Sequence, residues 1–125
     1  MKGTARAAYQ SQMVETASPA KLLVMLFDRL VVDIRQAEVA QFDGDFETAS
    51  QRLVHAQDIV LELSASLRHD VWDGSERLAS LYAYLHSELV RANIKRDPEV
   101  TGACLRIVEP LAEAWREAAL APVAG

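Results

Sequence analysis

Hydrophobic residues recur three or four positions apart along most of the chain, which places them on one face of an α-helix. The recurrence runs in four segments, residues 19–42, 46–67, 74–94 and 98–118, separated by short polar connections. Each segment of about 20 residues would form a helix about 30 Å long. Because the connections are short, consecutive helices are expected to lie antiparallel. The pattern predicts four helices packed side by side.

Residues at the start of each segment support these boundaries. Each segment is preceded by a residue whose side chain can cap a helix N-terminus, namely Ser18, Asp45, Asp73 and Asp97. Proline follows directly at Pro19 and Pro98, where its missing N–H costs nothing. Glu76 lies three residues after Asp73 and can complete a capping box, and Gly44 can end the first helix. Four helix starts are therefore predicted independently of the hydrophobic spacing.

The predicted fold is all-α: a single-domain antiparallel four-helix bundle over residues 18–120. Residues 1–17 are expected to be an N-terminal extension, flexible or capping the bundle, and residues 121–125 a frayed tail. Pro110 lies inside the fourth segment, where it removes the hydrogen bond to the carbonyl of Arg106. We therefore expect the last helix to be kinked near Pro110, unless it breaks there.

Each helix has one stripe expected to face the core. In the first helix this is a broad face of Leu23, Leu26, Phe27, Leu30, Val31, Ile34 and Ala37. The second stripe is Phe46, Ala49, Leu53, Ala56, Val60, Leu63 and Leu67. The third is Leu78, Leu81, Leu85, Leu89 and Ala92, and the fourth is Val100, Cys104, Ile107, Leu111, Ala114 and Ala118.

The first helix has more apolar residues than one core face uses. Leu22, Met25, Val32 and Val39 fall among its polar residues, which are Lys21, Asp28, Arg29, Asp33, Arg35 and Gln36. Met25, Val32 and Val39 are seven apart and so form a row along the predicted solvent side. Shorter groups of the same kind are Val54 with Leu61 and, on the third helix, Tyr84, Val90 and Ile94.

Two interpretations of the row are open at this point. The first helix could contact several neighbours and bury the row, or the row could receive an amphipathic partner helix through apolar contacts at helical spacing. An exposed row that receives a partner helix would need another segment to shield it from solvent when no partner is bound. The segment before Ser18 contains Tyr9, Met13 and Val14, which are well placed to shield it.

Composition and charge narrow the choice of partner. Half of the 125 residues are hydrophobic, which argues against disorder, and the formal net charge is −5 with no run of basic residues. Such a chain is a poor candidate for binding nucleic acid or anionic lipid. The N-terminus lacks the apolar core of a secretory signal, no stretch resembles a transmembrane span, and the single Cys104 fits a reducing cytoplasm.

Known catalytic patterns do not occur. The residues three before His55, His69 and His86 are not glutamate, so the Glu-x-x-His motif of di-iron bundles is missing. The sequence has no His-Glu-x-x-His motif, phosphate-binding glycine loop or cysteine pair. A histidine phosphotransfer domain remains as an alternative through His55 or His86, but neither has the nearby Lys and Gly expected there. No catalytic, cofactor-binding or metal-binding residue is predicted.

Several stretches resemble the FliS family of flagellin-specific export chaperones, in the expected order and from about Ala8 to Ala118. They are "AYQSQMVETASPAKLLVMLFDRLV" at 8–31, "AQDIVLELSASL" at 56–67, "LVRANIKRDPE" at 89–99 and "EAWREA" at 113–118. Two departures are Phe27, where the family commonly has tyrosine, and Pro110, where a helix-forming residue is usual.

The resemblance implies a cytoplasmic chaperone that binds the disordered C-terminal segment of flagellin, prevents premature polymerisation and delivers flagellin to the flagellar type III export apparatus. It implies contact with the export-gate membrane protein and, in some members, with an anti-sigma factor. An oligomeric state from monomer to weak homodimer is expected. The alternatives are a helical adaptor for another client, such as an anti-sigma factor, and the phosphotransfer domain.

Site residues follow from the resemblance and the row together. The flagellin-binding residues are predicted to be Leu22, Met25, Leu26, Val32, Val39 and Asn93, the last matching the family's "AN" pair in the third helix. The N-terminal cap is predicted to comprise Tyr9, Gln10, Met13 and Val14.

Overall fold

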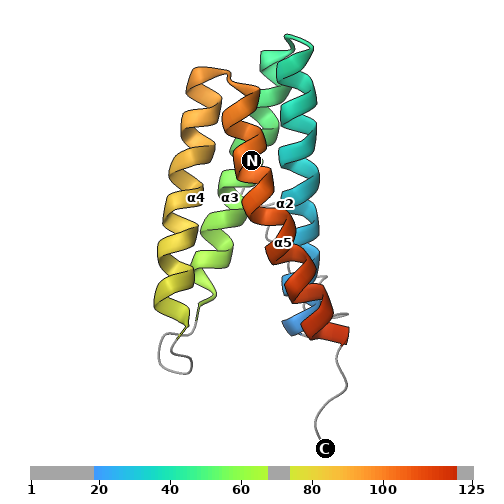
Figure 1. Cartoon of the computed structure of the whole chain (residues 1–125), viewed down its shortest axis with the longest axis vertical. Helices are drawn as coiled ribbons and strands as arrows, with labels where there is room; N and C mark the ends of the chain where they lie inside the picture. Colours follow the sequence, from blue (N-terminus) through green and yellow to red (C-terminus); the bar gives the residue numbers. More distant parts are fainter. Residues whose placement is uncertain (1–18, 68–73, 121–125) are drawn as a thin grey trace, which may run out of the picture.

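The structure, a computed structural model, describes residues 19–67 and 74–120. It contains four α-helices, α2 (Pro19–Phe42), α3 (Phe46–Ala65), α4 (Ser75–Lys95) and α5 (Pro98–Leu120) (Figure 1). No β-strand occurs within these ranges. The predicted all-α bundle is confirmed.

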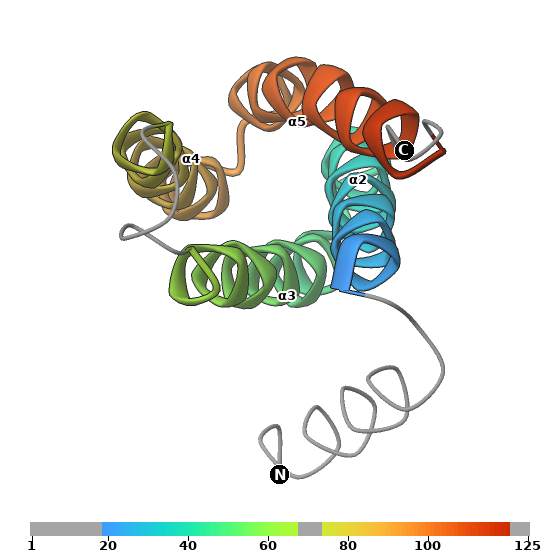
Figure 2. The ribbon, with the colours of Figure 1, turned by 90° about the horizontal axis from the view of Figure 1, so that it is seen from below.

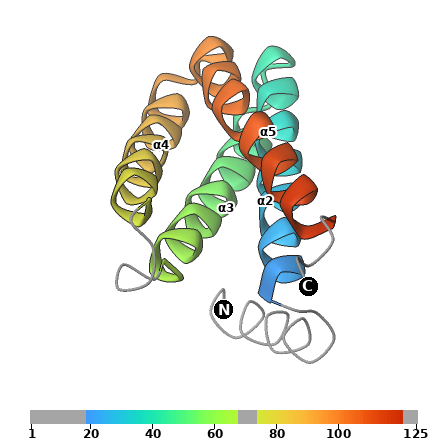
Figure 3. The same ribbon diagram turned by 60° about the horizontal axis from the view of Figure 1, so that its bottom comes forward.

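The helices form a ring in which each contacts two others. Helix α2 packs against α3 and α5, and α4 packs against the same two helices from the opposite corner (Figure 2). Consecutive helices run antiparallel (Figure 1). Helices α4 and α5 lie close together where they are joined and farther apart toward their other ends (Figures 1 and 3). One end of the bundle is therefore closed tightly and the other is wider.

Most predicted boundaries hold because the capping side chains act as expected. The Thr48 N–H donates to Asp45 Oδ1 at 3.2 Å, and the Glu99 N–H donates to Asp97 Oδ1 at 2.9 Å. Helix α2 begins at Pro19 and α5 at Pro98. Gly74, which has no side chain to donate or accept, precedes α4 instead of the predicted Asp73. Asp73 and Ser18 lie outside the described residues.

Gly44 forms the turn between α2 and α3 with a φ of +75°, a left-handed conformation that strains residues with a Cβ. A Cβ at this position would meet no atom within 4 Å, so conformation alone disfavours alanine. We expect Gly44→Ala to lower the free energy of unfolding by about 1–2 kcal/mol, measured by urea denaturation. Gly44→Asn should cost less, because asparagine tolerates this region. Equal stability of the Gly44→Ala variant and the unaltered protein would contradict this account.

The buried core joins all four helices. Its fully buried large side chains include Phe27, Leu30 and Ile34 of α2, Leu53 and Leu63 of α3, Tyr82, Leu85 and Leu89 of α4 and Val108 of α5. The Phe27 ring lies 6.5 Å from the Tyr82 ring and 6.4 Å from the Trp115 ring, centroid to centroid. All seven residues predicted for the core face of α2 belong to this core or pack against it.

A buried polar network holds the closed end together. Thr101 Oγ1 donates to Gln41 Oε1 at 2.6 Å, and Gln41 Nε2 donates to the Ala92 carbonyl at 3.1 Å. The network therefore connects α5, α2 and α4. Because Thr101 and Gln41 are buried, losing either partner would leave a polar group without a hydrogen bond, which is costly.

The second half of α5 differs from the prediction. Ala114 and Ala118 are exposed, whereas Val108 and Ala112 are buried in their place. The buried stripe continues from Cys104 in steps of four residues, through Val108 and Ala112, and does not return to a step of three as predicted. The helix also continues through Pro110, so the alternative that it breaks there is wrong. Figure 1 shows the α5 ribbon changing direction near its middle.

Candidate functional site

Three exposed apolar side chains follow the outer face of α2. Met25, Val32 and Val39 have 36%, 38% and 59% of their surface in contact with solvent. Their spacing of seven residues aligns them along the helix, and we refer to them as the α2 row. The interpretation in which neighbouring helices bury this row is wrong.

The other residues predicted for the site have different surroundings. Leu22 is half-buried, and Leu26 is half-buried against the core. Asn93 Nδ2 donates to Ser50 Oγ at 3.2 Å, which joins α4 to α3 on a side of the bundle that does not include α2. The structure therefore does not bring Asn93 next to the α2 row. Tyr9, Gln10, Met13 and Val14 lie outside the described residues.

Exposed large apolar side chains also occur elsewhere in residues 19–67 and 74–120, but within these ranges they form no other row of this length on one helix. They are Phe42, Leu61, Tyr84, Ile94 and Leu120. Single exposed apolar residues are common on soluble proteins and need no special explanation. The α2 row differs because its members align over about 21 Å of one helix.

On the α3 side of the row, a buried carboxylate holds three basic side chains. Asp33 is fully buried, although its position on the helix predicts a solvent-facing residue. Its Oδ1 lies 3.1 Å from an Arg29 nitrogen and 3.6 Å from an Arg52 nitrogen, and its Oδ2 contacts His55 Nδ1. The buried charge is compensated by two guanidinium groups, Arg29 of the same helix and Arg52 of α3. We call these four residues the α3-side cluster.

The sequence analysis does not predict this cluster, although two of the spacings that form it can be recognised in the sequence. Arg29 precedes Asp33 by four residues, a spacing that allows an ion pair on one helix. Arg52 and His55 are three apart on α3 and so lie on one face of that helix. What the sequence does not show is that this face of α3 turns toward Asp33.

On the α5 side of the row, acidic groups outnumber basic ones. Arg116 pairs with both Asp28 and Glu113, and an Arg35 nitrogen lies 2.5 Å from a Glu109 carboxylate oxygen. All five side chains are substantially exposed to solvent. We call them the α5-side cluster. The α2 row thus lies between two groups of charges.

Cys104 is buried in the core, and burial raises the pKa of its thiol to about 11, with a smaller contribution from the Glu88 carboxylate. The thiol pKa is higher in the folded protein than the value of about 8.5 expected for the unfolded chain. Its contribution to stability is therefore fully present below about pH 8.5 and is lost as the pH rises through 11. Because the thiolate is the reactive form, we expect 5,5′-dithiobis(2-nitrobenzoate) to label the native protein at pH 8 about 100-fold more slowly than the urea-unfolded protein. Equal rates would contradict burial of this thiol.

The described residues show no arrangement of known catalytic chemistry. In residues 19–67 and 74–120, no group of three or more His, Cys, Asp or Glu side chains is placed to hold a metal ion. None of the four helices in these ranges is both long and apolar enough to span a membrane. His55, one candidate for phosphotransfer, has its Nδ1 against Asp33.

The fold and these surfaces define a class: a single-domain antiparallel four-helix bundle with a line of solvent-exposed apolar side chains along one helix. The family model of the flagellar protein FliS matches residues 1–122. The chain therefore belongs to the FliS family, whose members are chaperones and not enzymes.

Individual relatives agree with this assignment. The chain is 33% identical to the flagellar secretion chaperone FliS of Bacillus subtilis over 111 residues, which cover 89% of this chain and 83% of that protein. It is 28% identical to the protein of the same name from Vibrio cholerae, over 92% of this chain and 88% of the relative. A solved structure described as a flagellar chaperone from bacteria has the same fold, with a TM-score of 0.73 at 20% identity, over 90% of this chain and 95% of the other.

Proposed function

We propose that this chain binds the disordered C-terminal segment of flagellin and that the α2 row is part of the binding surface. The observation that carries the proposal is the alignment of Met25, Val32 and Val39 on the solvent side of a helix that already fills the core with its other face. A stable bundle does not require such a row. An amphipathic helix with apolar residues at matching intervals would cover it.

The length of the row suits a helical client. Met25 and Val39 are separated by fourteen residues, or about 21 Å along α2, which corresponds to about four turns of a second helix. A segment that folds on binding loses conformational entropy worth several kcal/mol, so a large contact area must offset that cost. Leu22 and Leu26 at one end of the row would extend the contact.

Binding of this kind would explain the name that the relatives carry. Sequestering the C-terminal segment would prevent premature polymerisation of flagellin in the cytoplasm and keep it competent for the type III export apparatus. The export-gate membrane protein is then a further partner in our proposal, and an anti-sigma factor is a second client. Residues Tyr9, Gln10, Met13 and Val14 would cover the row in the free protein.

The test is to measure mass in solution, by light scattering after size-exclusion chromatography, with and without a flagellin C-terminal peptide from the same organism. We expect the free chain to be a monomer or weak dimer and a one-to-one complex to form with the peptide. A stable dimer that excludes the peptide would instead indicate that the row pairs with a second copy. Absence of any complex with a monomeric chain would overturn the proposed client.

A further inference from the structure

Helix α5 bends near Pro110, and the direction of the bend follows from the side of the helix that the proline occupies. The Pro110 ring clashes with the carbonyl group of Arg106 and donates no hydrogen bond to it, so the helix opens on the side that carries both residues. Pro110 and Arg106 are exposed to solvent. The second half of α5 therefore leans away from that solvent side and toward the other helices (Figure 1).

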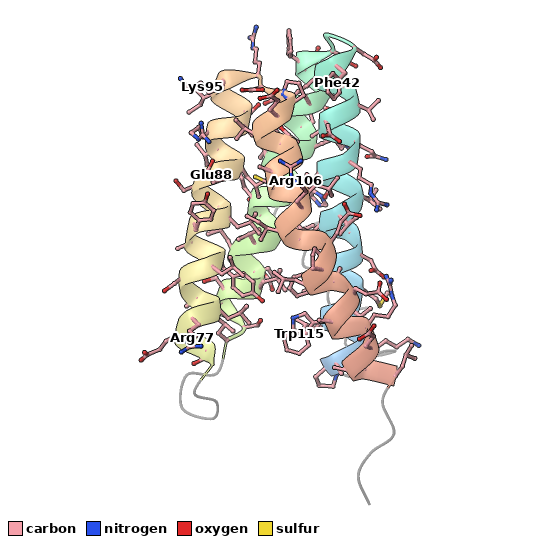
Figure 4. All side chains as sticks on the ribbon, viewed as in Figure 1. Phe42, Arg77, Glu88, Lys95, Arg106 and Trp115 are labelled. Atoms are coloured by element: carbon pink, nitrogen blue, oxygen red, sulfur yellow. The ribbon has the colours of Figure 1, made fainter. Side chains whose placement is uncertain are left out.

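The second half of α5 packs on α2 while it diverges from α4. The Trp115 ring lies 6.4 Å from the Phe27 ring of α2, and Arg116 pairs with Asp28 of α2. Helices α4 and α5 separate toward this end of the bundle, where Arg77 of α4 lies well apart from Trp115 (Figures 3 and 4). At the wider end, α5 is thus joined to the first half of α2.

These contacts place Leu120, the last residue of α5, beside the α2 row. Leu120 lies four residues after Arg116, which is one turn further along the same side of α5. Val24 lies four residues before Asp28, one turn away on the same side of α2. Helices α2 and α5 run antiparallel (Figure 1), so the pairing of Arg116 with Asp28 sets the level of Leu120. Leu120 is level with Val24 and with its neighbour Met25.

Leu120 contributes little to the core, because 79% of its surface is in contact with solvent. Met25 is exposed as well, and Val24 is half-buried. A single exposed leucine needs no special explanation, but Leu120 continues an apolar row onto a second helix. At the Met25 end of the row, α2 and α5 together therefore present an apolar surface that is broader than one helix.

We propose that Leu120 is a further contact for the client helix and that Pro110 is the positioning residue that places it there. A client helix on the α2 row contacts Leu120 beside Met25, where both helices offer apolar side chains. Without the bend, the second half of α5 would lie farther toward solvent, and Leu120 would lie farther from Met25. The inference rests on the proposed function, because it assumes that the client covers the row.

Leu120→Ala tests the contact, and Ile94→Ala is the matched control, because Ile94 is 75% exposed near the end of α4. We expect Leu120→Ala to weaken binding of the flagellin C-terminal peptide about three- to tenfold, measured by isothermal titration calorimetry, since part of one apolar side chain is lost from the interface. Ile94→Ala should leave the affinity unchanged. Equal affinities of the two variants would overturn the inference. If the Met25→Asp, Val32→Asp protein also binds normally, the proposed function fails as well.

Pro110→Ala tests the positioning role, because alanine restores the N–H donor and removes the clash that bends α5. In a protein that also carries Trp72→Phe, the fluorescence of Trp115 should shift to longer wavelength as the second half of α5 leaves α2. Pro110→Ala alone should weaken the flagellin peptide about as much as Leu120→Ala does, and the two changes together should weaken it no further. Additive effects of the two changes, or an unchanged Trp115 emission, would overturn the role of Pro110.

Discussion

Replacing Met25 and Val32 together by aspartate is expected to abolish binding of the flagellin C-terminal segment while leaving the bundle folded. Both side chains are more than one-third exposed, so their loss removes little from the core. In a complex the two carboxylates would be buried against the apolar face of the client without partners. Residues at the centre of an interface commonly cost about 2 kcal/mol or more each, so we expect the dissociation constant to rise by about 100-fold or more.

The measurement is isothermal titration calorimetry with the flagellin peptide, together with circular dichroism of the free protein. Tyr84→Asp is the matched control, since Tyr84 is 54% exposed on α4, outside the α2 row. Unchanged affinity of the Met25→Asp, Val32→Asp protein would show that the row is not the binding surface. Loss of cooperative unfolding would show that the row belongs to the core.

Local sequence signals were sufficient for the helices and for the row. Asp45 and Asp97 act as caps because each carboxylate accepts a hydrogen bond from a backbone N–H two or three residues later in the chain. This hydrogen bond does not depend on any other helix. The alignment of the α2 row follows equally directly from a spacing of seven on one helix, whereas its exposure depends on the neighbouring helices and is left open by the sequence. Features set within a single helix, such as these two caps and this alignment, therefore agree with the structure.

Features that depend on two helices were not accessible in the same way. The position of Asp33 on its own helix predicts a solvent-facing side chain, yet Asp33 is fully buried and its carboxylate faces α3. Whether a charged residue at the edge of a helix is buried depends on which side chains the neighbour places opposite it. Here Arg52 and His55 decide the outcome, and hydrophobic spacing in α3 says nothing of their position.

The second half of α5 illustrates the same limit for apolar residues. From Cys104, a stripe can continue to Ile107 or to Val108, since both spacings are compatible with a helix. In the structure Val108 is fully buried, because α5 turns that face toward the other helices. When one helix has two nearly equivalent apolar faces, the sequence cannot show which of them is buried unless the position of the neighbouring helix is known.

The largest loss of stability is expected for Phe27→Ala. The Phe27 ring is fully buried, and it lies between Tyr82 of α4 and Trp115 of α5, at the wider end of the bundle. Trp115 lies on the same half of the molecule as Arg77, away from Phe42 and Lys95 (Figure 4). Removing the ring leaves a cavity where α2 joins those two helices, which should cost about 3–5 kcal/mol, measured by urea denaturation. That is a large part of the roughly 5–15 kcal/mol typical of a domain.

Phe42→Ala provides the matched control, because the same change is made on the same helix at a side chain that is 70% exposed. It should alter the free energy of unfolding by less than about 0.5 kcal/mol. Under conditions where the Phe27→Ala protein remains folded, it should still bind the flagellin peptide, because Phe27 faces the core and not the α2 row. A similar loss of stability in both variants would contradict the assignment of Phe27 to the core. Loss of binding by the folded Phe27→Ala protein would show that the row depends on packing at the wider end of the bundle.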